Sequence, residues 1–122
     1  MITENEILRG QNITSEMREN LKKLLIAVNK LRKLWAKQMI VTSGYRTPEH
    51  NKTIGGAPNS KHCQCLAVDF ADYDGELKKF CKSNNYQVLI DCELFMEASE
   101  STPSWLHVTI SAPISGKREF KP

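Results

Sequence analysis

The feature that most constrains the fold is a single apolar stripe at helical spacing between Ser15 and about Lys37. Its members are Met17, Leu21, Leu24, Leu25, Val28, Leu31 and Trp35. Positions three or four residues apart lie on one face of an α-helix, so the stripe predicts a long helix that covers a hydrophobic core. Thr14 or Ser15 is suited to cap its start, because a hydroxyl oxygen accepts a hydrogen bond from a free backbone N–H.

The rest of the chain alternates short strand-like and helical stretches. Runs 39–43, 66–70, 86–91, 93–97 and 105–110 are typical of strands, and 47–54 and 74 to about 84 are typical of helices. A loop rich in Ser, Thr and Pro joins the last two strand runs, which predicts a hairpin. We therefore expect one α+β domain over residues 1–122, with helices packed on an antiparallel sheet.

Composition excludes several classes of protein. A length of 122 residues suits one domain, and the apolar runs are far shorter than the roughly 20 residues that span a bilayer. The net charge is only +3, without a dense basic patch containing aromatic residues, so nucleic-acid binding is not expected. Met1 to Gly10 shows no signal-peptide pattern, so we expect cytoplasmic synthesis without export by that route. We also expect a monomer.

Four cysteines occur, at positions 63, 65, 81 and 92. Because no signal peptide is expected and the chain is long enough for a core, we interpret them as reduced thiols.

One set of residues suggests a metal site. His62 precedes a strand run that carries Asp69, and His107 lies on a later strand run. A buried aspartate is costly unless it is paired or bound to a cation. Two histidines and one carboxylate, with a fourth position left to water, are a usual catalytic zinc set. The spacing alone also permits purely structural histidines.

Four stretches together carry a family resemblance: 41–51 (VTSGYRTPEHN), 54–62 (IGGAPNSKH), 67–70 (AVDF) and 105–107 (WLH). They resemble the D-Ala-D-Ala carboxypeptidases and peptidoglycan endopeptidases, which share their fold with the hedgehog signalling domain and include many phage endolysins. The resemblance covers nearly the whole chain.

The resemblance implies that Zn²⁺ is held by His62, Asp69 and His107, and that zinc makes hydroxide available near neutral pH. It also implies that Arg46 faces the substrate, where a guanidinium suits a carboxylate or a developing oxyanion. The alternative for Arg46 is a structural role that bridges loop carbonyls. Ser60 matches a position beside the first ligand, where it would orient that ligand or contact substrate, and plain loop chemistry is its alternative.

The general base is less clearly marked. Many members of the family have an acid three residues before the last histidine, where this chain has Ser104. Another branch has the pattern Leu-x-Met-Glu at the end of the preceding strand, which matches Glu97. We therefore expect Glu97 to be the base, with Glu93 and Glu100 as rivals.

Cys65 departs from the family pattern, because it replaces a glycine that such a position often needs for a positive φ. A second hypothesis is a structural zinc site made by His62, Cys63, Cys65 and Cys92.

The resemblance implies a zinc peptidase that cuts peptidoglycan stem peptides, D-Ala-D-Ala or L-Ala-D-Glu bonds alike, as a phage or bacterial lytic enzyme. Such an enzyme acts on the cell wall after release or as a virion component. The alternative is a catalytically silent module that keeps the fold and the metal.

Overall fold

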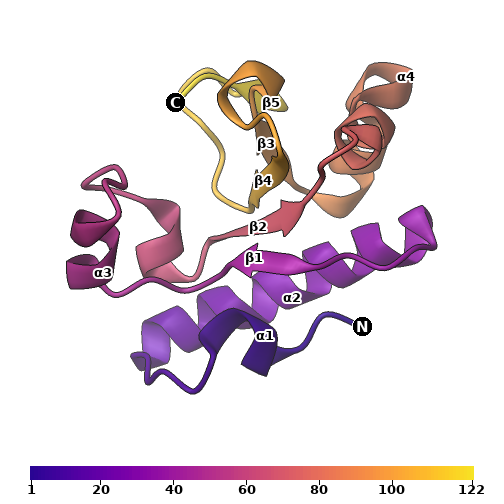
Figure 1. The fold of residues 1–122 in the computed structure, drawn as a ribbon. Coiled ribbons are helices and arrows are strands. Elements are labelled where there is room, and N and C mark those ends of the chain that lie inside the picture. Colours follow the sequence, from indigo (N-terminus) through magenta and orange to yellow (C-terminus); the bar gives the residue numbers. More distant parts are fainter.

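The long helix predicted from the apolar stripe forms as α2, Ser15–Trp35, in the computed structural model of residues 1–122 (Figure 1). The hydroxyl of Thr14 accepts a hydrogen bond from the backbone N–H of Met17 at 3.2 Å, so the predicted cap is confirmed. The inner face of the helix is buried at Leu21, Leu24, Ala27, Val28 and Leu31. The helix ends at Trp35, and the cap residue Ala36 that follows adopts a left-handed conformation.

Five strands form one sheet in the order β1-β2-β4-β3-β5. Their bounds are β1 Val41–Ser43, β2 Ala67–Ala71, β3 Phe95–Glu97, β4 Trp105–Thr109 and β5 Glu119–Phe120. Every neighbouring pair is antiparallel except β3 and β5, which are parallel. The α+β class is therefore confirmed, and the sheet is mixed rather than wholly antiparallel. Strand β5 was not predicted.

The predicted hairpin is β3 and β4, and its loop contains the 3₁₀ turn η2, Ser99–Ser101. Alternation along these strands gives the sheet two different faces. Val68, Phe70, Met96, Leu106 and Val108 are fully buried and belong to the hydrophobic core. The residues between them in sequence point to the opposite face, which carries the polar side chains described below.

Two short helices, α1 and α3, lie on either side of strand β1 in the sequence, with α2 between α1 and β1. Helix α1, Glu4–Leu8, was not predicted, although Thr3 and Glu6 form a capping box at its start. Gly44, just after β1, lies against α1, where a Cβ atom would stand 2.4 Å from the backbone oxygen of Ile7. Helix α3, Pro48–Thr53, begins as predicted, with Thr47 as its cap. A second 3₁₀ turn, η1, spans Lys61–Gln64.

The predicted strand at 86–91 is wrong, because these residues belong to helix α4, Glu76–Cys92. The helix is interrupted from Ser83 to Tyr86, where the backbone angles are not helical. The break lies where the sequence predicts that the helix beginning at residue 74 ends, near residue 84. Beyond the break, Leu89 and Cys92 are the buried positions, and their spacing of three residues is helical rather than alternating.

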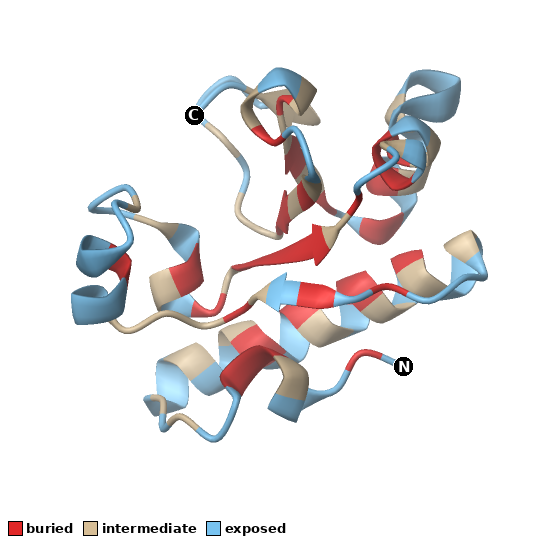
Figure 2. Ribbon diagram, viewed as in Figure 1, coloured by how far each residue is buried: buried red, intermediate tan, exposed pale blue.

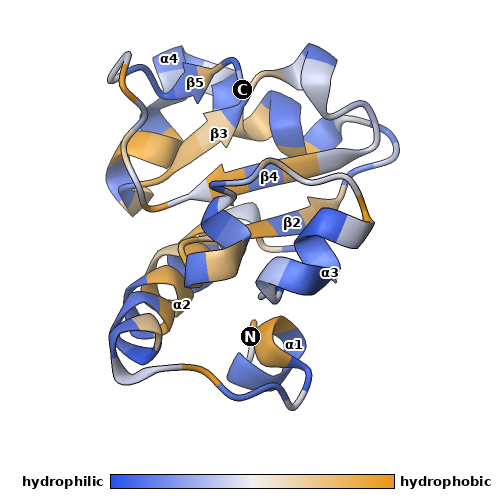
Figure 3. Cartoon of the chain, turned by 90° about the vertical axis from the view of Figure 1, so that its left-hand side faces the viewer, coloured by the Kyte–Doolittle hydropathy of each residue, from blue (hydrophilic) through white to orange (hydrophobic).

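Helices α2 and α4 pack together beside the sheet, and the rings of Trp35 and Phe80 join them with centroids 5.0 Å apart. Buried residues gather along the central strands and the inner face of α2 (Figure 2). Helix α3 is largely hydrophilic (Figure 3). None of the helices is long and apolar enough to cross a membrane.

Candidate metal centre

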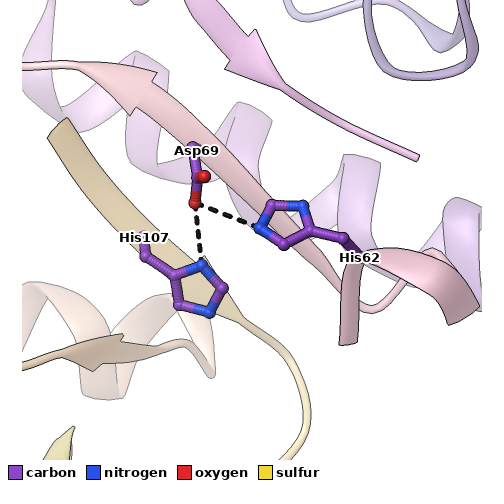
Figure 4. A group of neighbouring side chains, drawn as sticks. All are labelled: His62, Asp69 and His107. Atoms are coloured by element: carbon purple, nitrogen blue, oxygen red, sulfur yellow. Dashed lines mark hydrogen bonds and ion pairs between the residues drawn. The ribbon is translucent and has the colours of Figure 1, made fainter. Parts of the chain in front are cut away.

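His62, Asp69 and His107 converge on the polar face of the sheet (Figure 4). Asp69 on β2 is paired directly with His107 on β4, and His62 comes from η1. The Oδ1 atom of Asp69 lies 2.8 Å from Nδ1 of His107 and 3.2 Å from Nε2 of His62. One possible ligand atom from each residue lies within 4.8 Å of the others. The structure thus brings together the three residues that the resemblance singled out.

The orientation of His62 is fixed by its other ring nitrogen. Nδ1 lies 2.9 Å from the backbone oxygen of Gly44, and because a carbonyl oxygen only accepts, Nδ1 must donate. A neutral His62 then turns the lone pair of Nε2 toward the carboxylate of Asp69. Two lone pairs at this distance repel unless a proton or a cation lies between them, and the arrangement therefore fits a metal ion.

Asp69 is buried, and burial alone would raise the pKa of its carboxyl group. When no cation lies between them and the rings are protonated instead, hydrogen bonds from His107 and His62, together with the charges of these rings, outweigh burial and hold the pKa of Asp69 well below its usual range. The carboxylate is therefore ionised, as a metal ligand must be.

The donor set fits zinc. Imidazole nitrogen and carboxylate oxygen are ordinary zinc ligands, and three protein ligands leave a coordination position for water or substrate. The hydrogen bond from His62 to Gly44 is the kind of outer contact that fixes the tautomer of a ligating histidine.

The alternative site made with cysteines does not form. No cysteine belongs to the group of possible ligands around His62. Cys65 and Cys92 are buried in the hydrophobic core, and burial raises the pKa of the Cys65 thiol to about 11. Cys65 has a φ of 58°, which is the left-handed conformation expected for a position that favours glycine.

Arg46 stands beside the cluster with its guanidinium held on three sides. Nε donates to the hydroxyl of Ser43 at 3.0 Å, and Nη1 donates to Oδ1 of Asn51 at 3.2 Å. Nη2 lies 3.6 Å from Oδ2 of Asp69. The side chain bonds other side chains rather than the loop carbonyls considered in the alternative. Its position places a fixed positive charge at the edge of the candidate metal centre.

The partners of Arg46 were missed by sequence reasoning, although they lie in the same motif stretch. Asn51 is 3% exposed, and its Nδ2 donates to the backbone oxygen of Ala57 at 2.7 Å. Gly56 packs so closely that a Cβ atom there would stand 2.0 Å from Oδ1 of Asn51. Asn51 therefore orients the guanidinium, and Gly56 leaves the space that this orientation needs.

Ser60 accepts a hydrogen bond from the backbone N–H of His62 at 3.2 Å and caps η1. Its hydroxyl thus acts on the backbone of the histidine rather than on the ring. Next to Arg46, a groove of about 360 Å³ is lined by residues that include Thr42, Tyr45 and His50.

Glu97 lies across the hairpin from His107, because the register that pairs Met96 with Val108 sets these residues opposite each other. Oε2 of Glu97 is 4.0 Å from Nδ1 of His107. Burial raises the pKa of Glu97, the charges of His107 and His62 lower it, and the net direction is upward. The rivals lie elsewhere: Glu93 is exposed at the end of α4, and Glu100 is exposed and pairs with Lys121.

Comparisons with known proteins identify a family and a similar fold. The family described as Peptidase M15 matches residues 2–108. The fold is similar to the crystal structure of the Serratia marcescens L-Ala D-Glu endopeptidase ChiX, with a TM-score of 0.53 and 14% sequence identity. The likeness covers 85% of this chain and 92% of that chain. No curated protein matches the sequence.

Proposed function

The chain belongs to the peptidase M15 family, and from this membership we propose that it is a zinc-dependent hydrolase of amide bonds in peptidoglycan stem peptides. The observation that carries the proposal is the convergence of His62, Asp69 and His107 beside Glu97 and Arg46. These residues come from separate segments of the chain. In this proposal they supply a cation site, an acid–base group and a fixed positive charge at one place.

In this proposal, His62, Asp69 and His107 hold the zinc ion. When bound, zinc polarises the scissile carbonyl group and lowers the pKa of water. The protein keeps both histidines in a usable orientation, since Gly44 fixes the His62 ring and the β2–β4 pairing fixes His107 against Asp69.

Glu97 is the proposed general base. A water molecule that attacks an amide carbon must lose a proton, and the leaving amine must gain one. The carboxylate of Glu97 faces the metal centre from the neighbouring strand, so it is placed to accept the first proton and deliver it to the amine. A side chain that changes its protonation state twice in this way returns to its starting form after each turnover.

Arg46 is the proposed stabiliser of negative charge. Attack on the carbonyl carbon moves charge onto oxygen, and a guanidinium held in advance stabilises that charge without reorganising during the reaction. Its three bonds leave further N–H donors free for a substrate carboxylate or the oxyanion. Ser60 is proposed to act beside it, through the backbone of His62 and at the substrate.

We propose that the groove beside Arg46 receives the stem peptide and selects the bond that is cut. Because the fold resembles that of an L-Ala D-Glu endopeptidase, we propose this bond as the first to examine, ahead of D-Ala-D-Ala. We also propose a monomeric lytic enzyme of a phage or bacterium that acts on the cell wall after release or as a virion component.

The test is digestion of purified peptidoglycan with the zinc-loaded protein. Mass spectrometry of the soluble products identifies the new amino terminus, and L-Ala-D-Glu cleavage differs from D-Ala-D-Ala cleavage in the mass released. A parent protein that binds zinc and releases no amine from any wall preparation would support the silent-module alternative instead.

A further inference from the structure

A basic groove lies between one face of α4 and the turn η2, and none of the residues proposed for catalysis lines it. The groove has a volume of about 500 Å³. It is lined by Gly75, Lys78, Lys79, Lys82, Ser83 and Ser99, so three of its six residues are lysines and none is acidic. The four α4 positions, 78, 79, 82 and 83, follow helical spacing, which sets them on a single helix face just after the cap residue Gly75.

Lys78 is the unusual member of this groove, because a positive charge is rarely buried without a partner. The residue is only 6% exposed. Its ammonium group donates to the backbone oxygen of Thr102 and takes part in none of the ion pairs of the molecule. An ammonium group has three N–H donors, and burial of a charge is costly without an opposite charge. The groove therefore contains a buried cation that lacks a counter-charge.

The other two lysines add to this excess. Lys79 is exposed, and its ammonium group has no hydrogen bond or ion pair. Lys82 lies 3.4 Å from the hydroxyl of Ser99 and 3.4 Å from Oε1 of Glu119. Lys82 is thus the one lysine of the groove in an ion pair, and its partner Glu119 already accepts hydrogen bonds from Tyr86 and from the backbone of Ser99.

The charge belongs to the side chains and not to the start of the helix. The first backbone N–H groups of α4 donate to Asp72 and Asp74, which satisfies them within the protein. No aromatic residue lines the groove, so it offers no surface on which a nucleic-acid base would stack.

From this geometry we propose that the groove binds a phosphate group, either as free phosphate or as a phosphodiester of an anionic polymer. Ammonium groups act as point charges toward phosphate oxygens, and the hydroxyl of Ser99, which accepts from Lys82, has its own O–H free as a further donor. The bound anion provides the counter-charge that Lys78 lacks. The site is independent of hydrolysis and of the metal.

Calorimetric titration with inorganic phosphate tests the proposal, with sodium chloride used to hold the ionic strength constant. We expect saturable binding to the parent protein. Lys79→Gln should weaken it by about tenfold or more, the effect of losing a hydrogen bond to a charged group. Lys33→Gln removes an equal charge from an exposed position on α2 outside the groove and should leave the affinity within about twofold.

A glycerol phosphate oligomer separates the two sources of phosphate. Tighter binding of the oligomer than of inorganic phosphate, at equal phosphate concentration, identifies the polymer, and equal affinity identifies the free anion. Ser99→Ala is a second variant that leaves Lys78 in place, and it should also weaken binding. Absence of saturable binding, or equal losses in Lys79→Gln and Lys33→Gln, would overturn the proposal.

Discussion

Asp69 and His107 face each other across strands β2 and β4, with Oδ1 of the aspartate 2.8 Å from Nδ1 of the histidine. This pairing depends on strand register, because a shift of one residue would turn His107 toward the core and bring a neighbouring apolar residue to the polar face. The full burial of Leu106 and Val108 on either side opposes such a shift. Core packing on one face of the sheet therefore fixes the metal centre on the other.

The first prediction concerns metal content. The parent protein should hold about one zinc ion per chain after gentle dialysis, and His107→Ala should release it, because one of only three protein ligands is lost. His50→Ala is the matched control, since His50 is exposed on α3 and lies outside the cluster. Elemental analysis of the purified proteins decides the matter. Equal zinc in the two variants would contradict the ligand assignment.

The second prediction concerns Glu97. Glu97→Gln keeps size and hydrogen bonding but cannot accept a proton, so turnover should fall by roughly 10²–10⁴-fold while zinc is retained. Glu100→Gln, at an exposed position of the turn η2 that follows β3, should change turnover less than about twofold. Release of stem-peptide amines measures turnover, and elemental analysis measures zinc. Full activity in Glu97→Gln would remove the residue from the mechanism.

Much of the fold follows from local patterns. The stripe of α2 repeats over several turns, so its period is unambiguous, and its cap at Thr14 is a local hydrogen bond. The hairpin also follows, because its two strand runs are close in sequence. Asp69 and His107 were placed on strands by the same reasoning, but their direct pairing depends on a register that no local pattern contains.

Other elements depend on contacts between distant residues. Strand β5 has only two residues, and it is held by its pairing with β3, by the Arg118 hydrogen bond to Leu94 at 3.0 Å and by the arginine over the Phe95 ring. None of these partners is visible from the tail itself. The contacts of Arg46 with Ser43 and Asn51 were missed because they require the folded loop around α3.

The third prediction is that Arg46→Lys is not conservative. Lysine keeps the charge but lacks the planar set of donors that reaches Ser43, Asn51 and Asp69 together. Activity should fall by at least tenfold, which corresponds to only about 1.4 kcal/mol of transition-state stabilisation. Arg32→Lys on α2 is the control. Activity of Arg46→Lys within about twofold of the parent would assign Arg46 to structure alone.

The fourth prediction uses two adjacent glycines. A Cβ atom at Gly56 would stand 2.0 Å from Oδ1 of Asn51, so Gly56→Ala should displace Asn51 and free the guanidinium of Arg46. We expect a fall in activity of about tenfold, the cost of losing one hydrogen bond to a charged group. Gly55 has a φ of +75° and nothing within 4 Å, so Gly55→Ala strains the backbone without touching Asn51. Urea unfolding measures the loss of stability in each variant. An equal loss of activity in both variants would show that backbone strain, and not displacement of Asn51, causes the loss of activity.

The last prediction concerns the pH dependence of stability and turns on Glu119. Burial acts to raise the pKa of this carboxyl group, but hydrogen bonds from Tyr86 and the backbone of Ser99, with the charge of Lys82, lower it overall. A group with a lowered pKa in the folded state stabilises the fold above its unfolded pKa, and this contribution is lost as pH falls through the folded value.

Glu119→Gln should therefore unfold at lower urea concentration than the parent at pH 7. Its free energy of unfolding should be lower by about 1.5 kcal/mol, because hydrogen bonds to a charged group are lost. The difference in free energy of unfolding between parent and variant should narrow at about pH 3, below the ordinary glutamate pKa, because the parent then loses part of the same stabilisation. Glu93→Gln is the control, since Glu93 is exposed and its side chain makes no hydrogen bond or ion pair, and its effect should be small at both pH values. If the loss in free energy of unfolding in Glu119→Gln is the same at both pH values, the contacts of Glu119 depend on its shape and not on its charge.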